Sequence, residues 1–189
     1  MQFGTRRIWV WGARGLIALV TLSGAGCGAL GSPAVLLTPT GTCGSVQSFL
    51  AQEAVHIKPG EPHPPYNSNP PTSGWHWAAA QTWGVYTTQQ VQEQLVHNLE
   101  HGGVVIQYNN LSGPEVQRLT DLVRRDPRHL ILAPYPSLPA DAKVALAAWN
   151  APPAVAQAVG RLMYCTGVDE NAMSAFITSY RDKAPELVP

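Results

Sequence analysis

The sequence has no excess of basic residues and no hydrophobic run long enough for a membrane-spanning helix. Its 12 lysines and arginines are balanced by 12 aspartates and glutamates over 189 residues. Because proteins that bind nucleic acid gather basic residues into a stripe or patch, we expect no nucleic-acid partner. The apolar run at residues 15–22 is far shorter than the roughly 20 residues that a transmembrane helix needs.

The same apolar run fits a secretory signal peptide. Three arginines precede it, no residue from 15 to 26 is charged, and small residues follow it at 23–26. A basic start, a short apolar centre and small residues at the end are the parts of such a leader. We therefore predict a signal peptide of the lipoprotein type over residues 1–26, and export from the cytoplasm.

Cys27 follows this leader directly. Together with the small residues before it, Cys27 resembles the lipobox of bacterial lipoproteins, in which cleavage before the cysteine leaves that residue lipidated. Gly24 stands where the lipobox usually has leucine, so ordinary signal-peptidase cleavage after Ala25 or Ala29 is the alternative. A lipid on Cys27 would hold the protein to the membrane on its extracytoplasmic side, in the periplasm or at the cell surface.

Cys27 is one of only three cysteines, and an odd number of cysteines in an exported protein needs an explanation. If Cys27 carries a lipid, Cys43 and Cys165 remain as a pair, and an oxidising compartment would allow them to form a disulfide. For a loop of roughly 100 residues, the chain-entropy treatment gives a stabilisation of about 4.7 kcal/mol. Two unrelated buried thiols are the alternative.

Beyond the leader the chain divides into a tether and one domain. Residues 27–44 are rich in Gly, Ser, Thr and Pro without periodicity, as in a flexible tether. Residues 45–189 are enough for a single globular domain with its own core, and this domain is rich in histidine. Loss of the leader leaves nine basic against twelve acidic side chains, a net charge of about −3.

The stretch at residues 57–83, here called the Pro/Trp-rich loop, has an unusual composition. It contains six prolines together with one tyrosine and three tryptophans. Prolines at this density exclude a helix or a central strand. A loop of this length is either disordered or functional, and disordered segments have few aromatic residues. We therefore expect an ordered loop that wraps over the domain.

Helices and strands are expected to alternate along the rest of the domain. A helix at 89–101 would end at the glycine pair 102–103, and a second helix would open at the capping box 112–115. The other expected elements are strands at 104–108 and 130–133, a strand or a helix at 144–149, and a helix after Asp169. This order predicts an α/β protein, an α+β sandwich in which helices pack on a small mixed sheet and the Pro/Trp-rich loop covers one helix.

The first expected helix carries two histidines in positions that suit a metal ion. His97 and His101 are four residues apart, so both side chains lie on one face of the helix and can share an ion. On a helical wheel they lie opposite the apolar stripe of Leu95 and Leu99, with Glu100 beside them. They therefore face either water or a covering segment, and the Pro/Trp-rich loop is the expected cover.

Further histidines lie in or beside that loop. His76 stands between two tryptophans, and His56 and His63 flank the start of the loop. Imidazoles that converge from a loop and a helix suit Zn or Cu, so we predict one such ion on His97, His101 and His76, with His56 as the next candidate and His63 behind it. The alternative is that the helix histidines belong to a solvated face.

Several segments resemble an uncharacterised bacterial family known as domain of unknown function 3105 (DUF3105). They are YNSNPPTSG at 66–74, His76, GVY at 84–86, LVHNLEHGG at 95–103, LAPYP at 132–136 and the tail at 180–186. The resemblance covers about residues 45–186 and implies an exported or membrane-anchored domain without an established reaction. The polar residues shared with the family are His56, Asn67, His76, His97, Glu100 and His101.

From its place beside the histidines on the helical wheel, we expect Glu100 to hydrogen-bond a metal ligand and fix its tautomer, with a ligand or general-base role as the alternatives. Asn67, shared with the family, is expected to hydrogen-bond the ligands as well. The chain departs from the family near Trp83, where many relatives have a cysteine before the glycine. We therefore infer no thiol at the site.

The sequence His97-x-x-Glu100-His101 is also similar to the motif of the inverzincin peptidases, in which two histidines bind zinc and the glutamate activates water. The domain is small for that family, and the glycine pair ends the helix at once. A metal-dependent hydrolase or oxidase with Glu100 as general base is therefore the alternative function. The leading prediction is a lipid-anchored envelope protein that binds Cu or Zn for metal handling, with an envelope metalloprotein as a candidate partner. A structural envelope domain without metal is the third reading.

Overall fold

The structure is a computed structural model that describes residues 42–151 and 157–186. These residues belong to the second of two units into which the chain divides, Thr38–Pro189. The predicted signal peptide, the predicted lipidation site Cys27 and most of the predicted tether lie outside the described residues. The elements are β1 (Gln47–Leu50), β2 (His56–Ile57), β3 (His76–Trp77), β4 (Gly84–Val85), α1 (Gln92–Glu100), β5 (Val104–Tyr108), α2 (Gly113–Arg125), β6 (Leu130–Pro134), β7 (Val144–Asn150), β8 (Val159–Cys165) and α3 (Glu170–Tyr180).

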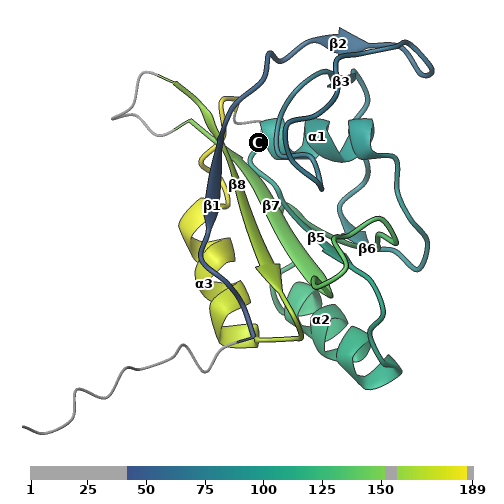
Figure 1. Ribbon diagram of the computed structural model, residues 1–189, viewed down its shortest axis with the longest axis vertical. Helices are drawn as coiled ribbons and strands as arrows, with labels where there is room; N and C mark the ends of the chain where they lie inside the picture. Colours follow the sequence, from purple (N-terminus) through teal and green to yellow (C-terminus); the bar gives the residue numbers. More distant parts are fainter. Residues whose placement is uncertain (1–41, 152–156, 187–189) are drawn as a thin grey trace, which may run out of the picture. The chain divides into compact units, whose positions relative to one another are not determined.

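Six of the described strands form a mixed sheet in the order β1-β8-β7-β5-β6-β4. The pairs from β1 to β5 are antiparallel, whereas β5, β6 and β4 run parallel. The parallel pair β5 and β6 is joined by α2, as parallel neighbours require a crossover. The short strands β2 and β3 pair with each other in parallel, apart from the large sheet, and lie next to α1 (Figure 1).

The two faces of the sheet pack against different helices, because successive residues of a strand point to opposite faces. On β5, Val104 and Ile106 belong to the core that includes side chains of α2 and α3. Val105 belongs to the second core, which includes Leu95 and Leu99 of α1. Helices α2 and α3 therefore cover one face, and α1 with the Pro/Trp-rich loop covers the other (Figure 1). The predicted α+β fold with helices on a mixed sheet is confirmed.

The segment that the sequence left as a strand or a helix is strand β7. All seven of its residues are buried, and it lies between β8 and β5 in the middle of the sheet. A strand covered on both faces reads as a continuous apolar run, and the small alanine side chains allow α1 to pack closely. Strands β1 and β8 were not predicted. The Arg161 side chain interrupts the apolar pattern of β8, and both strands are recognisable only from their pairing.

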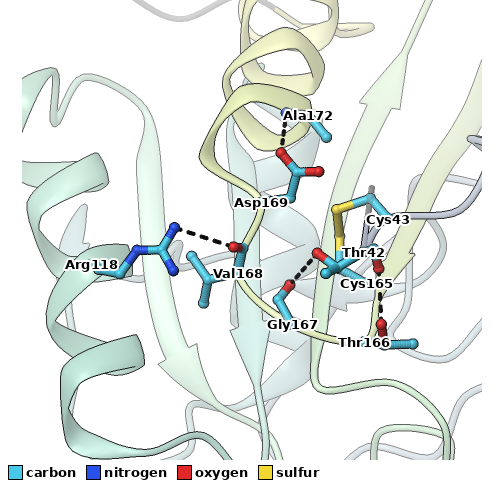
Figure 2. Close-up of a disulfide and its surroundings, with 9 residues drawn as sticks. All are labelled: Thr42, Cys43, Arg118, Cys165, Thr166, Gly167, Val168, Asp169 and Ala172. Atoms are coloured by element: carbon cyan, nitrogen blue, oxygen red, sulfur yellow. Dashed lines mark hydrogen bonds between the residues drawn. A yellow bond between two sulfur atoms is a disulfide. The ribbon is translucent and has the colours of Figure 1, made fainter. Parts of the chain in front are cut away.

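Cys43 and Cys165, the two cysteines predicted to pair, form a disulfide with a sulfur–sulfur distance of 2.06 Å (Figure 2). Backbone hydrogen bonds accompany it: Gly44 donates to the Tyr164 carbonyl, and Thr166 donates to that of Thr42. The bridge joins residues 122 positions apart and therefore ties the start of the described chain to the end of β8.

The C-terminal end of α1 is closed as the glycine pair predicts. Gly102 has a φ of +85°, and its N–H donates to the Leu99 carbonyl, while the N–H of Gly103 donates to that of Asn98. This pair of bonds is the Schellman arrangement, which needs a residue in the left-handed region. At Gly103 a Cβ would also lie 2.6 Å from the Trp83 ring. Both glycines are needed to end α1 directly after His101.

Across the described parts of the chain, every helix is too short or too polar to pass through a membrane.

Candidate metal centre

Two histidines of the site are brought together by strand pairing. In the parallel pair of β2 and β3, His56 lies directly opposite His76, so their side chains project from the same face. Their ring centroids are 4.9 Å apart. His76 is fully buried, with its ring edge-on to Trp149 at the end of β7. His56 is half exposed, so it forms the side of the site that is open to solvent.

Helix α1 supplies the opposite wall. His97 and Glu100 are three residues apart and therefore lie on one face of the helix, and both are buried, at 7% and 5% exposure. The loop that buries them is bonded to the helix: Asn98 donates to the Gln81 carbonyl and accepts from the Gln81 N–H. The Pro/Trp-rich loop thus covers the polar face of α1.

Four side chains converge between the loop and the helix. One ligand atom each from His56, His76, His97 and Glu100 lies within 4.8 Å of every other. The Oε2 atom of Glu100 is 2.9 Å from His76 Nε2 and 3.7 Å from His56 Nε2, and the rings of His56 and His97 stack with centroids 5.1 Å apart. Three imidazoles and one carboxylate are a ligand set found around Zn and Cu.

Two backbone carbonyls determine which ring nitrogens are available. The Nδ1 atom of His76 lies 2.7 Å from the Gly74 carbonyl, and Nδ1 of His97 lies 2.7 Å from the Trp77 carbonyl. A carbonyl oxygen can only accept, so both Nδ1 atoms carry the proton and both Nε2 atoms of the neutral rings carry a lone pair. For His76 this lone pair faces the Glu100 carboxylate at 2.9 Å. A cation, either a proton or a metal ion, must lie between these two atoms.

The pKa shifts favour a neutral imidazole at His97 and an ionised carboxylate at Glu100. Burial lowers the pKa of His97; the Trp77 carbonyl raises it, and the imidazoles of His101 and His76 lower it again, leaving it below its ordinary value. Burial alone would raise the pKa of Glu100, but the hydrogen bond with His76 and the positive charge that the surrounding imidazoles carry when protonated lower it overall. Both groups are therefore in the form that binds metal.

His101 lies beside this group rather than within it. Its Nε2 is 2.6 Å from Nε2 of His97, but it forms a separate cluster with Glu100 and Glu186. Because Nε2 of His97 carries a lone pair, Nε2 of His101 carries the proton that it donates there.

Asn67, expected to hydrogen-bond the ligands, and His63, the last candidate ligand, both lie outside the cluster. Asn67 bonds Gln52 and the Leu50 carbonyl, which places it at the end of β1, where it ties the loop to the sheet. His63 approaches Glu93 at 3.5 Å and also lies outside the cluster. Glu100 contacts His76, as expected of a residue that supports a ligand, and its carboxylate also lies among the four converging ligand atoms.

Sequence reasoning missed Glu186. This residue lies on the C-terminal tail, where no spacing pattern relates it to the histidines, and only the packing of the tail against α1 brings it near. Its presence in the tail segment that resembles DUF3105 was the one available signal.

Comparison with protein families matches residues 56–188 to the family described as "Protein of unknown function (DUF3105)". No curated protein and no solved structure matches the chain. The matched segment contains all the side chains of the two clusters and most of the sheet. As the resemblance predicted, the chain belongs to the DUF3105 family.

Proposed function

We propose that this protein is an exported, lipid-anchored envelope protein that binds one Cu or Zn ion for metal handling. The ligands are His56, His76, His97 and Glu100. The site joins the covering loop to α1, so an ion there would bind the two segments together. An envelope protein that delivers or accepts the ion is the expected partner.

The observation that carries this proposal is the pair of carbonyl contacts at Nδ1 of His76 and His97. Metal-ligating histidines almost always donate their second ring N–H to a carbonyl, a carboxylate or water, which fixes the ring and the tautomer. Here both rings are fixed in the same sense. The Nε2 lone pair of His76 faces the carboxylate of Glu100. The Nε2 lone pair of His97 accepts from His101, so an ion bound by His97 would take the place of that hydrogen bond.

The position of Glu100 favours binding over catalysis. A catalytic zinc site keeps three protein ligands and leaves one position for water, whereas a closed site has four. Glu100 brings the number of converging protein ligands to four, with Oε2 in contact with His76. A general base would instead stand back from the ion, within reach of a bound water.

The donor set limits the choice of metal. Nitrogen and oxygen ligands suit Zn²⁺ and Cu²⁺, and the absence of sulfur among these four residues argues against a dedicated Cu⁺ site. Cu²⁺ would bind more tightly than Zn²⁺ to the same ligands.

Export and anchoring are supported by the leader and by the disulfide. Disulfides persist in oxidising compartments and are rare in the cytosol, and Cys43 is bonded to Cys165. Replacement of Cys27 by alanine should release the protein from membranes and abolish acyl labelling. A variant that stays membrane-bound, together with a wild-type protein that carries no acyl group, would show that the anchor is wrong.

Metal binding is tested on the full chain purified without a histidine tag. Equilibrium dialysis against Zn²⁺ and, separately, Cu²⁺ should show binding, and His97→Ala or His76→Ala should weaken it by at least 100-fold. His63→Ala is the matched control, because it removes a histidine near the site without touching the cluster. Binding should also weaken as the pH falls below about 6.5, where imidazoles protonate.

Two outcomes would favour the other readings. If no ion binds, the histidines only hold the loop to the helix, and the protein is structural. If Glu100→Gln keeps full occupancy of the ion with a water bound to it, Glu100 is not a ligand and the hydrolase or oxidase reading becomes the better one. On the proposed reading Glu100→Gln lowers the affinity by at least 10-fold, because it removes a charged ligand.

A further inference from the structure

A second group of metal-ligating side chains lies at the C-terminal end of α1. Ligand atoms of Glu100, His101 and Glu186 all lie within 4.8 Å of one another. Glu100 belongs to both groups, whereas His101 and Glu186 belong to this one alone. The group becomes more exposed from one member to the next: Glu100 is buried, His101 is half-buried and Glu186 is exposed.

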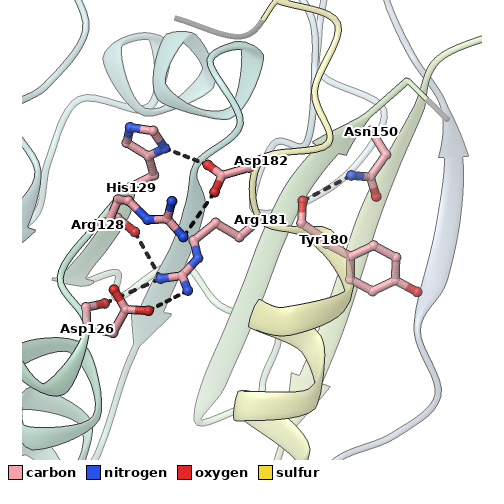
Figure 3. A network of polar contacts seen from close by, with 7 residues as sticks. All are labelled: Asp126, Arg128, His129, Asn150, Tyr180, Arg181 and Asp182. Carbon is pink, nitrogen blue, oxygen red and sulfur yellow. Dashed lines mark hydrogen bonds and ion pairs between the residues drawn. The ribbon is translucent and has the colours of Figure 1, made fainter. Parts of the chain in front are cut away.

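The tail that carries Glu186 is fastened to the domain at several points. Arg181 bonds Asp126, and His129 donates to Asp182 (Figure 3). The Asp182 N–H donates to the Gly102 carbonyl at 2.9 Å. The N–H of Glu186 itself donates to the Glu100 carbonyl at 3.2 Å. These two backbone hydrogen bonds, from Asp182 and from Glu186 itself, hold Glu186 against the end of α1. Its position therefore does not depend on an ion.

The tautomers explain why His101 is suited to a cation. Since Nε2 of His101 donates to His97, its Nδ1 carries the lone pair of the neutral ring. That Nδ1 atom is buried and has no hydrogen-bond partner among the described residues. A buried polar atom without a partner is rare in folded proteins and needs an explanation. A cation close to this ring supplies one.

We propose that Glu100, His101 and Glu186 form a second position for a divalent metal ion, next to the first and sharing the Glu100 carboxylate with it. The inference rests on the proposed function. Paired metal ions in proteins commonly lie about 3.5–4 Å apart, which a carboxylate with two oxygen atoms can span. With the imidazoles neutral, two divalent ions bring four positive charges to the site, which the carboxylates of Glu100 and Glu186 offset in part.

The two positions would differ in their number of protein ligands. The first is enclosed by the Pro/Trp-rich loop, with His56 as its exposed member, whereas the second ends at the exposed Glu186. Three protein ligands leave room for water or for a ligand from another molecule. Both positions have one exposed member, so the second differs from the first in having fewer protein ligands and therefore room for a ligand from a partner.

The test compares Cu²⁺ stoichiometry and electron paramagnetic resonance of the full chain and of Glu186→Gln. Asp141→Asn is the matched control, because this exposed acidic residue precedes β7, at the end opposite Trp149, which faces His76. Wild type and Asp141→Asn should bind two ions that give the signal of an interacting pair. Glu186→Gln should bind one ion with an isolated Cu²⁺ signal, and its affinity for that ion should stay within threefold of the wild-type value.

Each other outcome has a definite meaning. One ion in the wild type, unchanged in Glu186→Gln, would refute the second position and leave the first intact. No ion in any form would refute the proposed function and this inference together. If His101→Gln removes the tightest-bound ion, then His101 is a ligand of the first position, and the second position as drawn is wrong.

Discussion

Both faces of the sheet are buried, but they bury different kinds of side chain. The face toward α2 and α3 is filled mainly by aliphatic and aromatic residues, with Thr120 and Asn150 as buried polar groups on that side. Its helices are joined at the surface by ion pairs. The face toward α1 encloses more polar and ionisable groups: His76, His97, Asn98, Glu100 and Gln107. Withdrawing such groups from water costs free energy unless they are paired. The first face therefore provides stability, while the second gives up part of it for a site.

The two faces of the sheet also differ in how many buried polar atoms lack a hydrogen-bond partner. Among the described residues, four buried side-chain nitrogens lack a hydrogen-bond partner, and three of them, on His101, Gln107 and Trp149, lie on the α1 side. Departures from complete satisfaction concentrate at functional sites in natural proteins. This asymmetry supports a binding role for the α1 face independently of the ligand distances.

The largest expected effect tests the stabilising face. Leu132 is fully buried against α2 and α3, so Leu132→Ala should lower the free energy of unfolding by about 2–5 kcal/mol through lost burial and a cavity. Denaturant unfolding measures this change. Leu50→Ala is the control, since Leu50 is 65% exposed and its truncation should change stability by less than about 0.5 kcal/mol. Equal losses in both variants would contradict the division between the faces.

An intermediate effect is expected when an ion binds to the α1 face. Zn²⁺ at 100 times its dissociation constant should raise the free energy of unfolding by about 2.7 kcal/mol, because it binds the folded state alone. Thermal unfolding with and without Zn²⁺ measures this gain. His97→Ala should lose the gain, whereas Leu132→Ala should be less stable and yet keep it. A gain that persists in His97→Ala would place the ion elsewhere.

The smallest effect concerns the surface of the α2 and α3 face. The guanidinium groups of Arg125 and Arg118 hold the pKa of Glu170 below its ordinary value of 4.5. A carboxylate with a lowered folded-state pKa stabilises the protein above its unfolded-state pKa, and this contribution disappears as the pH falls through the lower value. Glu170→Gln should therefore cost up to about 1 kcal/mol at pH 7, as is usual for exposed pairs.

The same variant makes the pH dependence measurable. The stability difference between the wild type and Glu170→Gln should shrink on acidification from pH 7 to pH 3, as followed by urea unfolding. Metal affinity measured at pH 7 should be the same in both proteins. A difference in stability that grows toward acid pH would mean that the ion pair does not control the titration of Glu170.

Much of the fold could be predicted where the pattern is local. The capping box at Ser112 and Glu115 is present, and the runs that begin at Val104 and Leu130 form β5 and β6. The predicted helix at 89–101 is observed as Gln92–Glu100, shorter at its start. Strand β8 was missed because its role depends on pairing with β1 and β7, which its own residues do not reveal.

The site was also predictable only where its pattern is local in the sequence. Helical spacing was enough to place His97 and Glu100 on one face, and composition was enough to name the loop as the cover. The sequence offered His56 as a further candidate ligand and left several roles open for Glu100, and the positions of these two residues relative to the other histidines could not be decided from it. They depend on the register between β2 and β3, and two-residue strands inside a proline-rich loop leave no periodicity to read.

The sequence by itself determined which residues share a face of α1 and where that helix ends. Helical geometry relates residues three and four apart, and the glycine pair after His101 stops the helix by its backbone freedom. The tertiary structure alone decided that His76 and His97 present Nε2 to one centre, and that Glu186 approaches His101. The Gly74 carbonyl that orients His76 is only two residues away, but the Trp77 carbonyl that orients His97 and the tail that carries Glu186 come from distant segments. Such long-range contacts exist only once the chain has folded.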